Sequence, residues 1–376
     1  MKLLIGSDVV PTESNVNLFN KGDINSLLGN ELKNIWESVD LRIFNLETPL
    51  TEEGRSIPKQ GPNIKAPVST ITGIQALNPA LVTLANNHIL DYGEEGLNST
   101  VKLLEDKNIP FIGAGTNLKK ASKPYIIHQN NIKVGIYTCA EHEFTIATKD
   151  TPGANPFDPF ESLDHIAELK EKCDYVIVLY HGGKEHYRYP SPYLQKVCRK
   201  IVEKGADLVA CQHSHCIGTY EKYYDSTIVY GQGNFIFNKG SNSYWDTSLL
   251  IQVDFSDVLK VEYIPIQRTK QGTALSTGKD AEQIVNKFMI RSEEIKQEGF
   301  IEQKYQEFSN EHIKKYIRKI AGFGKWKSRI DRRMFKEKLL INKYSKQDLL
   351  AIQNYLECEA HRELLTNGLK NMINNK

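Results

Sequence analysis

Residues 207–215, with the sequence DLVACQHSH, place a short apolar run directly before two histidines, His213 and His215. An apolar run of this length between polar residues is typical of a buried β-strand. In an extended chain, side chains two residues apart point to the same side, so both imidazoles can face one site. We therefore expect a strand that carries two nitrogen ligands at its carboxyl end.

The same arrangement occurs four more times along the chain. Apolar runs at residues 2–6, 41–44, 81–85 and 174–180 each lead into a polar cluster, and these clusters contain Asp8, Glu47, Asn87 with His88, and His181. The strands of an open α/β sheet end in loops on a common edge, so residues that follow them meet in space. The ordered set predicts one site built from five strands.

The residue types in this set favour a divalent metal. Carboxylate oxygens, an amide oxygen and imidazoles are borderline-hard ligands, which suit Mn, Zn, Fe or Mg better than soft copper. A carboxylate such as Glu47 can bridge two ions, and two ions can clamp a phosphoryl group and activate water. A single histidine at a strand end is more often only hydrogen-bonded, so this hypothesis depends on the whole set.

Helical segments separate the predicted strands. Residues 94–107 follow a glycine and have apolar residues at helical spacing, and Ser191 with Pro192 begins a second helix that Gly205 ends. Residues 125–127 and 133–139 flank Gln-Asn-Asn and are typical of a β-hairpin. This alternation of strands and helices predicts an α/β fold.

Three longer motifs resemble one known family. They are NLETPLT at residues 45–51, NHILDYG at residues 87–93 and YGQGNFIF at residues 230–237. They are similar to the CapA branch of the calcineurin-like metallophosphoesterases, the bacterial capsule and poly-γ-glutamate synthesis proteins. The resemblance covers roughly residues 1–270. It implies a four-layer α/β/β/α sandwich over this range, followed by a helical, basic appendage over residues 271–376.

The resemblance also implies a role for each member of the set. One or two divalent ions would be held, with Asp8 and His215 on the first, Glu47 between the two, and Asn87, His181 and His213 on the second. His88 would act as general acid or as an electrostatic partner of the leaving group. Two positions depart from the family pattern. Val10 replaces the usual histidine two residues after Asp8, and Gln212 replaces the usual glycine before His213.

Further residues are candidates for substrate contacts. Lys59 and Lys65 lie in a loop rich in Gly and Pro after Glu47, and cations there would suit an anionic substrate. The alternative is that these lysines are solvated loop charges. The complete candidate set for substrate binding is Lys59, Lys65, Asp91, Asn234 and His142.

The cysteine content and the start of the sequence bear on the cellular compartment of the protein. The 376 residues carry a formal charge of +2, and of the six cysteines, four fall inside predicted strands or helices without C-x-x-C spacing. They are typical of reduced core thiols. The first strand begins at Lys2, and no apolar run approaches the roughly 20 residues of a membrane span. We expect a cytoplasmic protein without a signal peptide or transmembrane segment, with association at the inner face of the membrane as an option.

The last hundred residues differ in character. Between Lys314 and Lys338, lysines and arginines far outnumber the acids and are interleaved with Tyr316, Phe323, Trp326 and Phe335. Such a segment can dock on anionic lipid or another polyanion, or it can be an ordinary solvated face. We expect a membrane surface or a biosynthetic complex as partner, and we do not expect nucleic acid.

The resulting hypothesis is a metal-dependent hydrolase that acts on a phosphoester or on a γ-glutamyl or other amide bond in cell-surface polymer synthesis. Its substrate would be an anionic small molecule, peptide or polymer. Two alternatives stay open. The protein could be an assembly factor that binds an anionic polymer without turnover, which the loss of a ligand at Val10 favours. It could also be an isomerase or lyase that uses a base in the site on a carbon acid.

Overall fold

The computed structural model describes residues 1–240, 242–256, 259–322, 324–357 and 359–374. The chain divides into two compact units, Met1–Glu302 and Gln303–Lys376. The first unit runs on beyond residue 270 and includes α8 (Gly278–Glu294). Phe288 of this helix is fully buried and packs with Ile217 and Leu249, so the helix is part of the core of the first unit.

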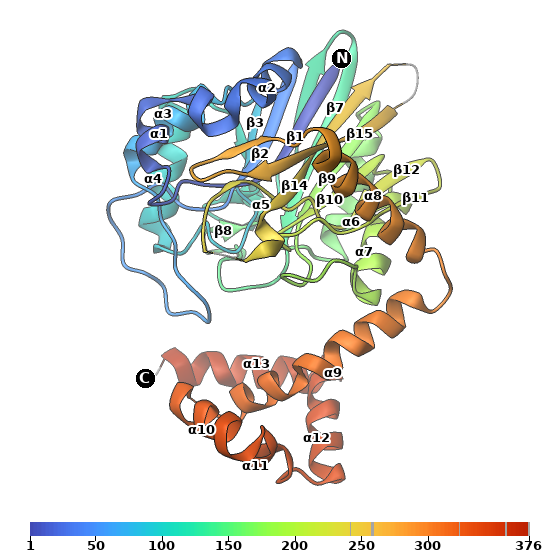
Figure 1. Cartoon of the computed structure of the whole chain (residues 1–376). Helices are drawn as coiled ribbons and strands as arrows, with labels where there is room; N and C mark the ends of the chain where they lie inside the picture. Colours follow the sequence, from blue (N-terminus) through green and yellow to red (C-terminus); the bar gives the residue numbers. More distant parts are fainter. Residues whose placement is uncertain (241, 257–258, 323, 358, 375–376) are drawn as a thin grey trace. The chain divides into compact units, whose positions relative to one another are not determined.

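The first sheet of this unit has eight strands (Figure 1). Its order is β16-β15-β14-β1-β2-β3-β4, and β13 also pairs with β1. The strands β1 to β4 run parallel to one another, whereas β14, β15 and β16 are antiparallel to their neighbours. Their bounds are β1 Lys2–Val10, β2 Leu41–Leu46, β3 Leu81–Thr83, β4 Phe111–Ile112, β13 Asn234–Phe237, β14 Thr247–Phe255, β15 Leu259–Arg268 and β16 Thr273–Leu275.

The second sheet has six strands in the order β11-β12-β10-β9-β7-β6. The strands β7, β9, β10 and β12 are parallel, and β6 with β7 forms the predicted hairpin. A third, two-stranded sheet pairs β5 with β8. The bounds are β6 Tyr125–Gln129, β7 Ile132–Ala140, β9 Tyr175–His181, β10 Leu208–Gln212, β11 Tyr220–Tyr223, β12 Ser226–Val229, β5 Ala114–Gly115 and β8 Gly153–Ala154.

The two large sheets share a buried apolar layer. Alternate residues of each strand face this layer, as the two-residue period of a strand requires: Leu3 and Ile5 come from β1, and Ile177 and Leu179 from β9. The other face of each sheet packs against helices in a core of its own. The helices that cover the first sheet are α1 Val16–Lys21, α2 Ile24–Ser38, α3 Ile71–Ala76 and α4 Gly93–Asp106. The helices that cover the second sheet are α6 Glu161–Lys170 and α7 Pro192–Glu203. The predicted four-layer α/β/β/α sandwich is confirmed.

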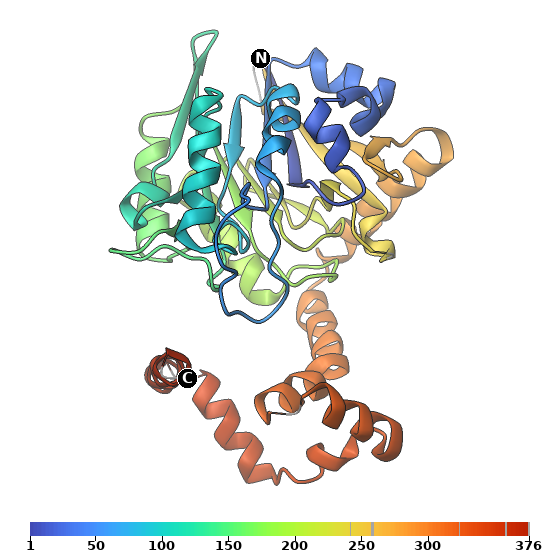
Figure 2. The ribbon, with the colours of Figure 1, turned by 90° about the vertical axis from the view of Figure 1, so that its left-hand side faces the viewer.

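Local signals set the ends of these helices. The hydroxyl of Ser191 accepts a hydrogen bond from the backbone nitrogen of Leu194 at 3.1 Å, and Pro192 occupies the first helical position of α7. A long loop spans residues 51–66 between β2 and the short 3-10 helix Val68–Thr70, and it comes to the front in Figure 2. This loop carries Lys59 and Lys65.

The second unit is helical, as predicted. Its helices are most of α9 (Phe300–Ile320), together with α10 Lys325–Phe335, α11 Lys338–Ile341, α12 Lys346–Glu357 and α13 Glu359–Asn374. Phe323, one of the interleaved aromatic residues, lies outside the described residues. Within the described part of the chain, no helix combines the length and the apolar character needed to cross a membrane. The five cysteines described are all free and buried: Cys139, Cys173, Cys198, Cys211 and Cys216.

Candidate metal centre

Five strands from both large sheets bring the predicted ligands together. Glu47 directly follows β2, and His213 directly follows β10. His181 is the last residue of β9 and lies opposite Gln212 of β10 in the register of the second sheet. Asp8 differs from the prediction, because it lies within β1 rather than after it, at an irregularity in the pairing with β13 between Asp8 and Val9. A bulge of this kind can re-aim a side chain beside a site.

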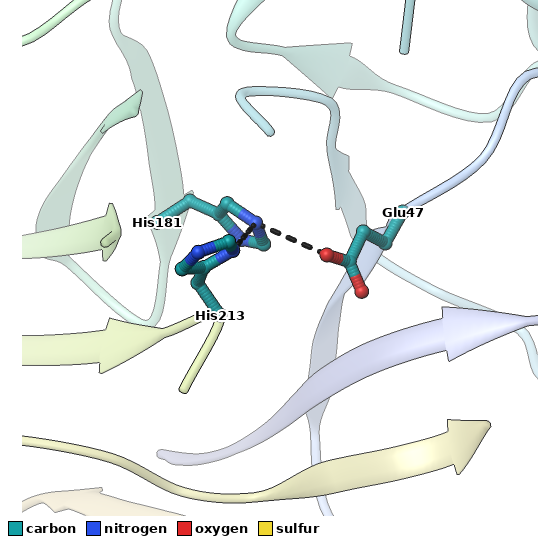
Figure 3. A group of neighbouring side chains, drawn as sticks. All are labelled: Glu47, His181 and His213. Atoms are coloured by element: carbon teal, nitrogen blue, oxygen red, sulfur yellow. Dashed lines mark hydrogen bonds and ion pairs between the residues drawn. The ribbon is translucent and has the colours of Figure 1, made fainter. Parts of the chain in front are cut away.

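The ligand atoms form two overlapping groups. Glu47, His181 and His213 make one group, and Asp8, Glu47 and His215 make the other; within each group the ligand atoms lie within 4.8 Å of one another. Figure 3 shows the first group, with the two imidazoles on one side and the carboxylate of Glu47 opposite them. The distance from Glu47 Oε1 to His181 Nε2 is 3.2 Å. Glu47 belongs to both groups, as a bridging carboxylate would.

Burial changes the protonation of these residues in the metal-free protein. Burial raises the pKa of Glu47 to about 8 and, with the nearby charge of Glu47, that of Asp8 to about 7. Burial also lowers the pKa of His181, of His213 and of His215, the last to about 3, so the imidazoles are neutral ligands. Both carboxylate oxygens of Glu47 are buried and have no hydrogen-bond partner among the described residues. A buried carboxylate without a partner is costly, and a bound cation would satisfy it.

Asn87, which follows β3, lies beside the same group of ligands. Its Oδ1 lies 3.1 Å from His181 Nε2, the atom that also faces Glu47. Its Nδ2 donates to Glu143 Oε2 at 3.2 Å, which leaves the amide oxygen toward the histidines. The structure thus brings together all six residues predicted as metal ligands, and their donor set fits a divalent ion such as Mn, Zn, Fe or Mg.

Neighbouring amides fix the orientation of these ligands. Asn45 donates to Asp8 Oδ1 at 2.8 Å, and Asn86 donates to Asn45 Oδ1 at 3.1 Å. Asn234 Oδ1 lies 2.8 Å from His215 Nδ1, and this hydrogen bond fixes the orientation of the imidazole ring. Asn45 lies in the NLETPLT motif, two residues before Glu47 in β2, and the structure gives it this supporting place beside Asp8.

The two late histidines reach the site by a different backbone from the one expected. The strand β10 ends at Gln212, and both His213 (φ 84°) and His215 (φ 54°) have left-handed backbone conformations. The prediction of an extended chain at these two residues is therefore wrong, although both imidazoles still face one site. Such conformations cost a non-glycine residue about 1–3 kcal/mol and tend to occur at functional positions.

His88 is held by a buried ion pair. Its Nδ1 lies 2.6 Å from Asp91 Oδ2, and the ammonium group of Lys59 contacts Asp91 Oδ1. The Lys59 side chain is 2% exposed, and that of Asp91 is fully buried. Because the carboxylate accepts the Nδ1 proton, the imidazole presents Nε2 to the other side.

A hollow of about 370 Å³ adjoins the ligands, which is the size of a small-molecule site. Lys59 and Lys239 supply positive charge to its wall, and Glu143 and Glu185 supply negative charge. Asn87, His88 and His215 line its floor together with Trp245. Trp245 and Lys239 were not identified from the sequence, because neither belongs to a motif or follows a predicted ligand strand.

The other predicted substrate contacts lie in different surroundings. Lys65 donates to the carbonyl oxygen of Glu52 at 2.8 Å and lies over the ring of Tyr92, away from the residues that line the hollow. Asp91 and Asn234 are buried behind His88 and His215. His142 is exposed after β7 and is not part of the lining.

The two positions that depart from the family pattern are occupied by packing residues. Val10 is buried and pairs with Phe237 of β13, so the group of Asp8, Glu47 and His215 has no further imidazole at that position. The side chain of Gln212 donates to the carbonyl oxygen of Gly6 at 3.2 Å and so helps to join the two sheets.

Comparisons with known proteins agree with the motifs. Residues 2–239 match the model of the bacterial capsule synthesis protein family PGA_cap. The chain belongs to this family. Among the relatives of this PGA_cap protein, the capsule biosynthesis protein CapA of Bacillus anthracis is 30% identical over 55% of this chain and 52% of that protein. The PGA biosynthesis protein CapA of Bacillus subtilis is 30% identical over 57% of this chain and 58% of that protein.

The PGA_cap chain thus spans about half the length of the curated relatives it matches. Among solved structures, a phosphatase from Mycoplasma pneumoniae is similar with a TM-score of 0.44 and 15% identity, over 71% of this chain and 93% of that protein.

Proposed function

We propose that this PGA_cap protein is a divalent-metal-dependent hydrolase that serves the synthesis of a cell-surface polymer such as poly-γ-glutamate. One observation carries the proposal: Glu47 belongs to two ligand groups at once, and both of its oxygens are buried without a hydrogen-bond partner among the described residues. A purely structural carboxylate would be expected to have such partners. The names of the two CapA relatives support the polymer theme.

In this proposal, one or two divalent ions held by the six ligands would supply the Lewis acidity that polarises the scissile group and lowers the pKa of water. The protein itself would position the acid. Asp91 holds Nδ1 of His88, so a protonated Nε2 can donate to the leaving group in the hollow. Lys59 compensates the charge of Asp91 and keeps this carboxylate in place.

The bond to be cleaved is a phosphoester or a γ-glutamyl or related amide bond. Lys239 in the wall of the hollow supports an anionic substrate, whereas the charge of Lys59 is compensated by Asp91. Glu143 and Glu185 stand in the same wall, so a substrate that also carries an amine would match it better than a simple phosphate. We place the reaction in the cytoplasm, in keeping with free and buried thiols.

A second candidate is an assembly factor that binds an anionic polymer without turnover. Val10 favours it, because without a histidine at that position the second ligand group consists of only Asp8, Glu47 and His215. A first ion bound by three residues would be held less tightly than one with a fourth nitrogen ligand.

The test combines metal content with two assays on the full chain. The purified protein is loaded with manganese, dialysed and measured for bound metal, for hydrolysis of bis-p-nitrophenyl phosphate and for cleavage of γ-glutamyl-p-nitroanilide. We expect His213→Ala to lose metal and activity, and His88→Asn to keep metal and lose activity. His128→Ala, an exposed histidine of β6, is the matched control and should behave as wild type.

Metal bound without hydrolysis of either substrate would favour the binding function. A wild-type protein that binds no manganese would contradict both the hydrolase and the ligand assignment.

A further inference from the structure

The helix α10 of the second unit has an apolar stripe that faces solvent. Trp326, Ile330 and Met334 are 75%, 50% and 72% exposed. They are four residues apart, so they lie on one face of the helix. Large apolar side chains scattered singly on a surface are ordinary, but a continuous stripe on one helix face marks a contact surface.

The rest of α10 is strongly basic. Its eleven residues include five cations, Lys325, Lys327, Arg329, Arg332 and Arg333, and a single acid, Asp331. Asp331 is fully buried, and its Oδ1 accepts a hydrogen bond from the backbone nitrogen of Leu339 at 3.0 Å. The side of α10 that carries Asp331 therefore faces the interior of the second unit, and the apolar stripe faces solvent. Lys327 and Arg333 are each adjacent in sequence to a stripe residue and lie on either side of it.

A basic hollow of about 790 Å³ lies beside the stripe, between α9 and α10. Lysines and arginines of both helices line it, with Lys315, Lys319 and Arg329 among them. Arg318 also lines it and is only 7% exposed. Its Nη1 lies 4.0 Å from Asp331 Oδ2 and has no hydrogen-bond partner among the described residues. Glu311 and Glu337 also line the hollow, and Glu337 Oε1 lies 3.1 Å from Arg318 Nη2, so a phosphate there would replace this carboxylate as the partner of the guanidinium group.

We infer that α10 docks on the surface of an anionic phospholipid membrane, with Trp326, Ile330 and Met334 inserted among the acyl chains and a lipid phosphate in the hollow at Arg318. Charge complementarity points to this occupant. The stretch from Lys314 to Lys338 holds eleven lysines and arginines against two acids, and a bilayer with acidic headgroups is attracted to such a segment. A helix with one apolar face and a cationic remainder lies in the interface of a membrane.

Two other occupants fit less well. A second copy of the same surface would bring two strongly cationic helices together, which is unfavourable. A nucleic acid would use the cations but would leave the aliphatic residues Ile330 and Met334 without apolar contacts. The docking surface belongs wholly to the second unit, so the inference is independent of the metal centre.

The experiment is co-sedimentation of the full chain with vesicles of phosphatidylglycerol and, separately, of phosphatidylcholine. We expect binding to phosphatidylglycerol vesicles that weakens with added salt, and at least roughly tenfold weaker binding to phosphatidylcholine. The variant with Trp326→Asp, Ile330→Asp and Met334→Asp should lose binding, as should Arg329→Glu with Arg333→Glu. Phe160→Asp removes an equally exposed aromatic residue from the first unit and is the matched control.

The fluorescence of Trp326 gives a second readout. Membrane insertion moves its emission to shorter wavelength, and a variant with Trp326→Phe identifies the signal against Trp36 and Trp245. Far-UV circular dichroism establishes that the stripe variants keep their helices.

No binding of the wild type to phosphatidylglycerol, or binding that the stripe variants retain, would overturn the inference. A wild-type dimer in sedimentation velocity that the stripe variants abolish would overturn it in favour of a second copy. Tighter binding to an oligonucleotide than to the vesicles, retained by the stripe variants, would overturn it in favour of a nucleic acid.

Discussion

Glu47 Oε1 and His181 Nε2 lie 3.2 Å apart although they come from different sheets. Glu47 follows β2 in the eight-stranded sheet, and His181 ends β9 in the six-stranded sheet. The ligand groups therefore join the two halves of the sandwich at one edge. A metal ion there would link the sheets to each other as well as serve the chemistry, and a ligand that binds only the folded state stabilises it.

Replacement of Glu47 by Gln tests this link directly. The change keeps the size of the side chain and removes the charge that both ligand groups share, so manganese affinity should fall by more than about a hundredfold. Metal-free protein should be no less stable than wild type, because a neutral glutamine has no charge to bury when pH rises above the pKa of Glu47, about 8. Calorimetric titration with manganese and thermal unfolding in EDTA measure the two effects. Glu37→Gln, on the exposed side of α2, is the control.

The stability of the metal-free protein should fall as pH rises between about 7 and 8. Burial raises the pKa of Asp8 to about 7 and that of Glu47 to about 8, so in this window the folded chain holds protons that the unfolded chain has lost. The free energy of unfolding then decreases by at most about 1 kcal/mol per pH unit for each carboxyl group. The ligand histidines oppose this only near and below pH 6.5, where they titrate in the unfolded chain.

Manganese should reverse this dependence, because metal binds the deprotonated carboxylates more readily as pH rises. Thermal unfolding at pH 7 and pH 8, with EDTA or with manganese, measures both slopes. A metal-free midpoint that climbs from pH 7 to pH 8 would show that these carboxyl groups are not held protonated.

The pair of Lys59 and Asp91 should show strong coupling. Asp91→Asn leaves the Lys59 ammonium group buried without its partner, which is expected to cost about 3–5 kcal/mol of unfolding free energy. Lys59→Met together with Asp91→Asn should recover most of this loss. Urea unfolding of the two single variants and the double variant gives the coupling energy. Additive effects of the two changes would mean that the ion pair does not exist in solution.

Asn45 should matter for metal binding through Asp8. Its amide donates to Asp8 Oδ1 at 2.8 Å, so Asn45→Ala frees this carboxylate to rotate and is expected to lower metal affinity by about 10- to 100-fold. Metal titration measures the change, with Asn20→Ala on α1 as a control away from the site. Unchanged affinity would assign Asn45 to the turn alone.

The strands, the helices and the convergence of the candidate ligands could be predicted because they depend on short-range patterns, whereas the four layers were implied by the family resemblance. Consecutive apolar residues such as Val176, Ile177 and Val178 define a strand with two buried faces, and polar residues at the ends of parallel strands share an edge. The residue at which the first unit ends could not be predicted from such patterns. The side chain of Phe288 is buried by residues far away in sequence, Ile217 and Leu249, and no local pattern announces such contacts.

Within the site, the convergence of the candidate ligands could be predicted but not the way in which each is presented. The displacement of Asp8 into β1 depends on how β1 pairs with β13, more than two hundred residues later. The wall formed by Lys239 and Trp245 depends on a loop whose path follows from tertiary packing. Such features arise from long-range contacts, which composition and periodicity do not encode.

The left-handed backbone at His213 gives the last expectation. At φ 84° a residue with a β-carbon is disfavoured, whereas glycine tolerates this conformation. In metal-free protein, His213→Gly should therefore be more stable than His213→Ala by about 1 kcal/mol, the reverse of their order in a regular helix or strand. Thermal unfolding in EDTA measures the difference. Glycine would relieve the backbone strain of this turn, but it has no imidazole. The loop therefore gives up some stability of the fold in order to present the His213 side chain to the ligand group.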